Sequence, residues 1–185
     1  MSTIALSTYS LGSKCSAVQG IEFAVEHGFH GLELGSWTLW PDVMSRSDVG
    51  RVRTLAAANG IDLSIHFIHR GVYPASHDPE RRAVHLGQLE GTLNLAHDIG
   101  AGPIVVHPGS IDRAGTGPDE ATEEVRREAI DHLAVFLSEG ARMAEKTGTV
   151  LCVENLPHSP GLVIESYDEM VDVVKRVSSP AVRIT

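Results

Sequence analysis

The residues best suited to chemistry in this chain are polar side chains that stand where short apolar runs end. His66, His107 and Glu154 each occupy such a position. Imidazole and carboxylate groups are ligands for divalent ions such as Zn²⁺, Mn²⁺, Co²⁺ and Mg²⁺, and a bound ion can polarise a sugar oxygen or a water molecule. If the three apolar runs are neighbouring parallel strands, their carboxyl ends meet at one rim. The residues therefore predict a divalent-metal site.

Other polar and aromatic residues lie close to these positions in the sequence. His69 is a rival to His66, because loop geometry could present either imidazole. Glu33 lies in the second apolar run, and Trp37 follows it, where an indole could wall a sugar ring or pack over the edge of the fold. Asn155 directly follows Glu154 and could orient that carboxylate, hold its loop or face a substrate.

The elements that must position these residues alternate strictly along the chain. Six short apolar runs predict strands, at 4–10, 31–35, 61–67, 104–106, 150–153 and 181–185. Amphipathic spacing between them predicts helices, at 13–27, 47–58, 79–99, 119–146 and 166–177. Asp78-Pro79 and the capping-box pattern Ser166-x-x-Glu169 mark two of the helix starts.

Alternating strands and helices predict a parallel sheet with helical crossovers. The sequence after the first strand, Leu11-Gly12-Ser13, lacks a glycine-rich dinucleotide fingerprint, and no phosphate-binding loop motif is present, so a barrel is favoured over an open doubly wound sheet. A (β/α) barrel uses about 31 residues per unit. We therefore expect residues 1–185 to form a single domain, an incomplete TIM-type barrel of about five βα units plus a sixth strand.

Composition narrows the environment and the partners. Hydrophobic residues make up 42% of the chain, which is typical of a globular protein. The chain's formal net charge of −9 argues against a nucleic-acid partner. Its two cysteines, Cys15 and Cys152, are too few for a disulfide framework. No signal-peptide pattern and no apolar run of about 18 residues is visible, so we expect a cytoplasmic protein without a membrane partner.

Three segments resemble motifs of one superfamily. The run Val105-Val106-His107-Pro108-Gly109-Ser110 resembles the strand-four motif of the xylose-isomerase-like TIM barrels, which include endonuclease IV and sugar-phosphate isomerases and epimerases. Val153-Glu154-Asn155 resembles the strand-five motif of that superfamily, and Ser64-Ile65-His66 with the later Pro74-Ala75-Ser76 resembles its strand-three segment. The resemblance extends over essentially the whole chain.

The resemblance implies a divalent-metal-dependent isomerase or epimerase that acts on a sugar or sugar phosphate by carboxylate-mediated proton transfer. It implies that Glu154 is a metal ligand and an acid/base group, and that His107 and His66 occupy metal-ligand positions of the endonuclease IV branch. Glu33 matches a strand-two position that often faces the substrate. From their places beside the strand ends, we also expect His69, Trp37 and Asn155 to contact the substrate. An endonuclease IV-like zinc phosphodiesterase acting at abasic DNA is the alternative enzyme.

The superfamily's next motif, Asp-x-Gly-His on strand six, would begin about where Thr185 ends the sequence. The resemblance thus implies that ligands and a second carboxylate from strands six to eight are not in this sequence, and we expect a truncated product, an incomplete sequence or one half of a split assembly. The expected protein partners are a second copy of the chain or a separate C-terminal half. A non-catalytic remnant that binds metal or a sugar is the third interpretation.

Overall fold

Six parallel strands form one sheet in the part of the chain that the computed structural model describes, residues 4–12, 14–36, 44–112, 122–157 and 161–185. The strands are paired in sequence order, β1-β2-β3-β4-β5-β6, and every pair is parallel. Their bounds are β1 (Ala5–Ser7), β2 (Gly31–Gly35), β3 (Asp62–His66), β4 (Pro103–Val106), β5 (Val150–Val153) and β6 (Val182–Ile184).

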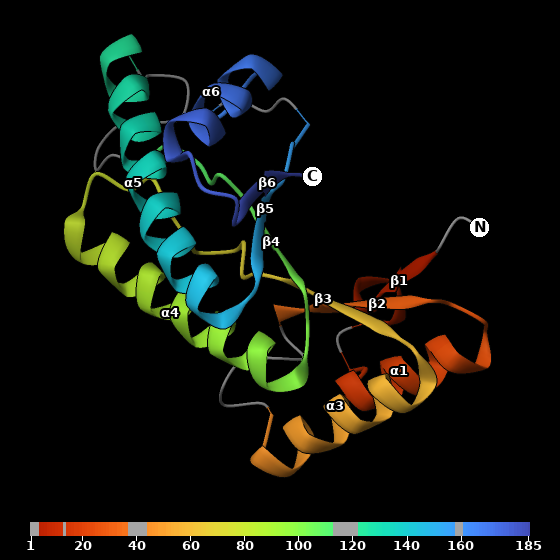
Figure 1. Ribbon diagram of the computed structural model, residues 1–185. Coiled ribbons are helices and arrows are strands. Elements are labelled where there is room, and N and C mark those ends of the chain that lie inside the picture. Colours follow the sequence, from red (N-terminus) through yellow and green to blue (C-terminus); the bar gives the residue numbers. More distant parts are fainter. Residues whose placement is uncertain (1–3, 13, 37–43, 113–121, 158–160) are drawn as a thin grey trace.

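Helices join consecutive strands and wrap around one side of the curved sheet, while the C-terminus lies toward its other side (Figure 1). These helices are η1 (Thr8–Leu11, a 3-10 turn), α1 (Ala17–Glu26), α3 (Arg46–Asn59), α4 (Pro79–Ile99), α5 (Glu123–Thr147) and α6 (Tyr167–Val177). Among the described residues β1 and β6 pair with one neighbour each, so the sheet is open. The predicted incomplete barrel of parallel strands is confirmed.

The core lies between the helices and the convex face of the sheet. Strand residues that point outward, such as Leu34, Ile65, Ile104 and Leu151, stand side by side in the register and are fully buried. They pack with buried residues of the helices, and burying each such aliphatic side chain contributes roughly 1.5–3 kcal/mol. The alternate strand residues point to the concave face, because successive side chains of a strand face opposite ways.

Local capping interactions set the helix starts, some where the sequence predicts them and others several residues later. Ser166 and Glu169 form the expected capping box at the start of α6. Ser16 and Ser45 open α1 and α3 with capping boxes of their own, so α1 begins at Ala17 and not near residue 13. The long α5 begins at Glu123, with Thr122 as its N-cap.

The first strand is shorter than predicted. It ends at Ser7, and residues 8–11 form the 3-10 turn η1 in place of the expected strand end. The Ser7 side chain accepts a hydrogen bond from the backbone N–H of Tyr9, and the buried Thr8 hydroxyl accepts one from the N–H of Gly35 on β2. These side chains thus draw backbone groups out of the strand ladder, as serine and threonine often do.

The start of α4 offers a direct test of a capping interaction. One carboxylate oxygen of Asp78 accepts hydrogen bonds from the backbone N–H groups of Glu80 (2.9 Å) and Arg81 (3.4 Å). Replacing Asp78 with alanine should lower the free energy of unfolding by about 1 kcal/mol, measured by urea denaturation. The matched change Glu90→Ala, at an exposed position inside the same helix, should alter it by less than about 0.5 kcal/mol. Equal effects of the two changes would contradict the capping role.

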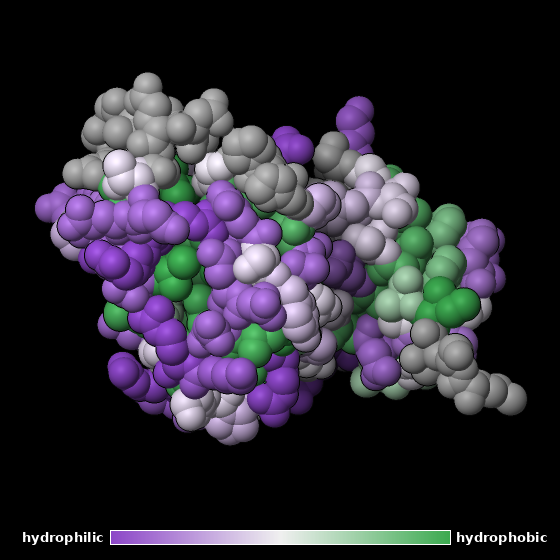
Figure 2. All heavy atoms as spheres, turned by 90° about the horizontal axis from the view of Figure 1, so that it is seen from above, coloured by the Kyte–Doolittle hydropathy of each residue, from purple (hydrophilic) through white to green (hydrophobic). Residues whose placement is uncertain are grey.

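The surface is mainly hydrophilic on the face seen in Figure 2, with apolar side chains in smaller groups, the largest toward the right of the view. Within the described ranges, none of the helices combines the length and the apolar character needed to cross a membrane. Cys15 and Cys152 are both free thiols, as expected for a chain without a disulfide framework.

Candidate metal centre

Strand alternation places the predicted site residues on one face at one end of the sheet. In the register, His66 stands beside Val105, and Val105 stands beside Cys152. These residues share the concave face, so the residues two positions further on, His107 and Glu154, point the same way. The carboxyl ends of β3, β4 and β5 thereby deliver two imidazoles and a carboxylate to the same rim.

The three side chains meet closely. His107 Nε2 lies 3.3 Å from His66 Nε2 and 2.7 Å from Glu154 Oε2, and His66 Nε2 lies 3.5 Å from the same oxygen. Donors held about 2.0–2.2 Å from a tetrahedral zinc lie roughly 3.4 Å from one another. The spacing between the two imidazoles and that between His66 and Glu154 agree with this value, and the contact between His107 and Glu154 is shorter.

Two further observations fit a cation at this point. Glu154 Oε2 is buried and makes no hydrogen bond of acceptable geometry among the described residues, which is costly unless another group satisfies it. His66 Nδ1 donates a hydrogen bond to the carbonyl oxygen of Phe67 (3.0 Å), so neutral His66 carries its lone pair on Nε2. Fixing the far nitrogen on a backbone carbonyl is how proteins orient a metal-binding imidazole. The residues present therefore fit a divalent ion.

The electrostatics favour neutral imidazoles. Burial is the main cause that lowers the pKa of His107; His66 lowers it further, while the Glu154 carboxylate raises it in part. Burial likewise lowers the pKa of His69, and the imidazoles of His107 and His66 add to that effect. A lowered pKa keeps these rings uncharged near pH 7, and an uncharged ring is the form that can bind a metal ion.

The rim opens into a cavity of about 560 Å³. Its lining includes the predicted substrate-facing residues Glu33, His69 and Asn155 in addition to the three convergent groups. Glu33 is held from the neighbouring strand, because Ser7 Oγ donates a hydrogen bond to its Oε1 (2.8 Å). Trp37, expected to wall a sugar ring, lies outside the described residues. A polar cavity of this size can accommodate a small polar ligand.

The sequence did not single out Ser7 or Tyr9, which also line the cavity. Tyr9 Oη lies 3.2 Å from His69 Nδ1, and the Tyr9 ring packs edge-on against His66 at 5.3 Å between centroids. Ser7 stands beside Glu33 in the register. Their position at the end of the first strand could have predicted that both residues line the site. That prediction requires knowing that the strand ends at Ser7.

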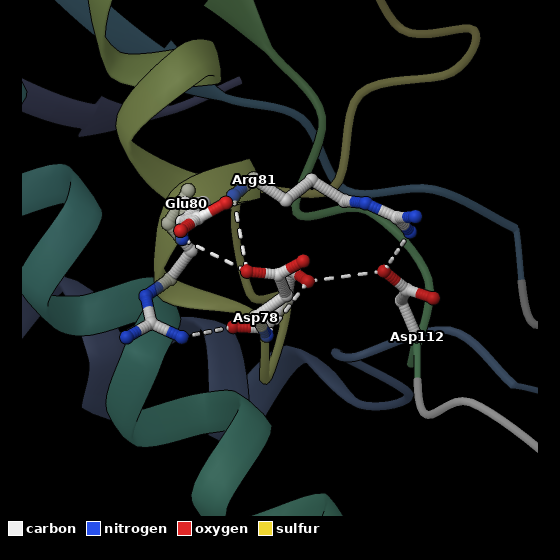
Figure 3. A network of polar contacts seen from close by, with 6 residues as sticks. Asp78, Glu80, Arg81 and Asp112 are labelled. Carbon is white, nitrogen blue, oxygen red and sulfur yellow. Dashed lines mark hydrogen bonds and ion pairs between the residues drawn. The ribbon is translucent and has the colours of Figure 1, made fainter.

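Polar contacts behind the rim tie the loop after β3 to the loop after β4 (Figure 3). The buried Ser76 donates a hydrogen bond to Asp112 Oδ2 (3.0 Å), and Arg81 at the start of α4 forms an ion pair with the same carboxylate. Backbone hydrogen bonds between Ile111 and Gly161, and between Val163 and Gly109, add the loop after β5. The loops that follow all three ligand-bearing strands are therefore fastened together.

Gly109 has two reasons to be glycine. Its φ is +83°, a conformation that side chains with Cβ rarely adopt, and a Cβ added there would lie 2.8 Å from Pro74 Cδ. Gly109→Ala should therefore destabilise the fold by about 1–3 kcal/mol and shift His107, measured as a loss of both unfolding free energy and zinc affinity. Gly102→Ala is the control, because Gly102 directly precedes β4 at its other end and a Cβ added there meets nothing within 4 Å. An unchanged Gly109→Ala protein would contradict this account.

Comparison with known proteins identifies a family and several relatives of this chain. Residues 21–185 match the family model described as xylose isomerase-like TIM barrel. Among curated proteins, the chain is 23% identical over 173 residues to an uncharacterised protein of Methanocaldococcus jannaschii, covering 92% of this chain and 55% of that protein. It is 24% identical over 135 residues to the probable endonuclease 4 of Mycoplasma pneumoniae, covering 72% of this chain and 43% of that protein. The chain thus spans about half the length of the curated relatives it matches.

Solved structures share the fold at low identity. A D-psicose 3-epimerase from Clostridium cellulolyticum H10, with D-tagatose, superimposes with a TM-score of 0.82 at 20% identity, covering 99% of this chain and 62% of that one. The IolI protein with a binding zinc atom superimposes with a TM-score of 0.74 at 12% identity, covering 98% and 61%. The superposition spans nearly all of this chain and establishes the shared fold.

Proposed function

We propose a function for this chain, which belongs to the xylose isomerase-like TIM-barrel family. It carries the metal-binding part of a divalent-metal-dependent isomerase or epimerase that acts on a sugar or sugar phosphate. Residues 1–185 would be part of a single barrel domain. The observation that supports the proposal is the mutual approach of His66, His107 and Glu154 within 2.7–3.5 Å in the lining of a polar cavity.

The proposed roles follow from the chemistry of each group. His66, His107 and Glu154 would hold the ion, which when bound would act as a Lewis acid toward a substrate oxygen. Glu154 would also take a proton from the carbon beside a substrate carbonyl, as a general base. Glu33, fixed by Ser7, can accept a hydrogen bond from a sugar hydroxyl, and Asn155 at the cavity edge can both donate and accept.

The structural relatives support the sugar chemistry. One carries the name D-psicose 3-epimerase and contains D-tagatose, another is a 3-keto-D-glucoside 4-epimerase from E. coli, and the IolI structure includes zinc. The first two names denote inversion of a carbon in a keto sugar. A carboxylate beside imidazoles that would hold a metal ion is suited to such a proton transfer.

Deuterium exchange tests the proposal with the chain itself. Removing a proton next to a carbonyl needs a single base, so the zinc- or manganese-loaded protein in D₂O should exchange deuterium into the carbon beside the carbonyl of D-fructose, D-psicose or D-tagatose, followed by NMR. Treatment with EDTA should abolish the exchange. His27→Ala, which removes an exposed imidazole on the far end of α1, should leave it unchanged. Metal-loaded protein without any exchange would contradict the proposal.

A second candidate is a zinc phosphodiesterase that acts at abasic DNA. The match to a probable endonuclease 4 and the imidazole-rich centre favour it, while the net charge of −9 opposes binding to a polyanion. Incubating the zinc-loaded protein with an oligonucleotide that contains one abasic site decides between the two. Cleavage that EDTA inhibits, together with no deuterium exchange, would favour the nuclease.

A further inference from the structure

His69 lies close enough to the candidate metal centre to take part in it. Ligand atoms of His66, His69 and His107 all lie within 4.8 Å of one another. The His69 ring stacks on His107 at 4.9 Å between centroids, with 28° between the planes, and meets the His66 ring edge-on at 5.2 Å. Three imidazoles thus lie together, and the Glu154 carboxylate contacts two of them, His66 and His107.

The environment of His69 resembles that of an oriented ligand. Its Nδ1 lies 3.2 Å from Tyr9 Oη. When Nδ1–H donates to that oxygen, the lone pair of the neutral ring is on Nε2. A hydroxyl on the far nitrogen then holds the ring orientation, as the Phe67 carbonyl does for His66. His69 is also in a loop, so a small loop movement can bring it from within 4.8 Å to ligand spacing.

We propose that His69 is a fourth metal ligand, with Tyr9 as its positioning residue, and that the resulting centre of three imidazoles and one carboxylate selects Zn²⁺ or Co²⁺ over Mn²⁺ and Mg²⁺. The inference rests on the proposed metal centre and changes the expected role of His69 from substrate contact to ligand. Imidazole nitrogen suits zinc and cobalt, whereas manganese and magnesium prefer oxygen ligands. All four ligands come from β3, β4, β5 and the loop after β3.

Metal titrations of the purified chain test the proposal without reference to activity. Calorimetry should give an affinity for Zn²⁺ at least about 100-fold above that for Mn²⁺. His69→Ala should weaken zinc binding by about 10–100-fold, and Tyr9→Phe by about tenfold, since ligand and supporting groups both contribute to affinity. Co²⁺ bound to the parent protein should show the intense visible absorption of four-coordinate cobalt, which should weaken in His69→Ala.

Two further variants separate the possible outcomes. His69→Glu replaces the nitrogen ligand with oxygen, so it should retain a bound ion but narrow the preference for Zn²⁺ over Mn²⁺, which a merely structural role for His69 would not do. His107→Ala tests the underlying centre. If His107→Ala loses zinc while His69→Ala keeps the parent affinity and spectrum, the role of His69 is overturned and the proposed function stands. If neither variant changes binding, the proposed centre itself fails.

Discussion

Replacing Glu154 with glutamine is expected to lower the deuterium-exchange rate of the metal-loaded protein by about 10²–10⁴-fold, the usual contribution of a general base. That loss corresponds to roughly 2.7–5.4 kcal/mol of transition-state stabilisation. The substitution keeps the size of the side chain and removes its charge, so it removes both the proposed base and an anionic ligand. Zinc affinity should fall by at least about 100-fold, or about 2.7 kcal/mol.

The same substitution should leave a signature on a neighbouring ring. The carboxylate of Glu154 raises the pKa of His107 against the larger, opposite effect of burial. In Glu154→Gln the pKa of His107 should therefore fall further below 6.5, which NMR titration of the metal-free protein can measure. Glu26→Gln, which makes the same change at an exposed position on α1, should affect none of these quantities. A pKa of His107 that does not move, or that rises, would contradict the contact.

The sequence predicts the central part of the site because local patterns determine it. Short apolar runs fix β4 and β5, and a polar residue directly after each run must follow the same alternation as the strand, which places His107 and Glu154 on the concave face. Helix α4 and the capping box of α6 are predicted for a similar reason, since Asp78-Pro79 and Ser166 act on backbone groups within one turn.

Features that depend on contacts between distant parts of the chain are harder to predict from the sequence. The end of β1 is decided by contacts of Ser7 and Thr8 with β2, which no local pattern indicates. The position of Tyr9 in the cavity lining is therefore not predicted from the sequence. The sequence offers His66 and His69 as alternatives, but both rings line the cavity: His66 is the last residue of β3, and the loop after β3 brings His69 to the same place.

Acid should weaken both the fold and metal binding: His69 and His107 contribute to both effects, and His132 to the fold alone. The folded-state pKa values of His69, His107 and His132 are all lowered, mainly by burial, from an unfolded value of 6.5. Below that pH the unfolded chain binds more protons than the folded protein. Stability contributed by these neutral rings is thus present above pH 6.5 and is lost as the pH falls through the folded-state pKa values.

Metal-free protein should therefore show a roughly level histidine contribution to the free energy of unfolding between pH 8 and about 6.5, and a decline below that range, measured by urea denaturation. Zinc affinity should decline more steeply in the same window, by up to about tenfold per pH unit for each ligand imidazole that must lose a proton. The lowered pKa of Glu169 acts separately, because its stabilisation is lost only below the ordinary carboxylate value of 4.5. Zinc affinity that holds constant or rises as the pH falls through the folded-state pKa values of these rings would show that imidazoles do not bind the ion.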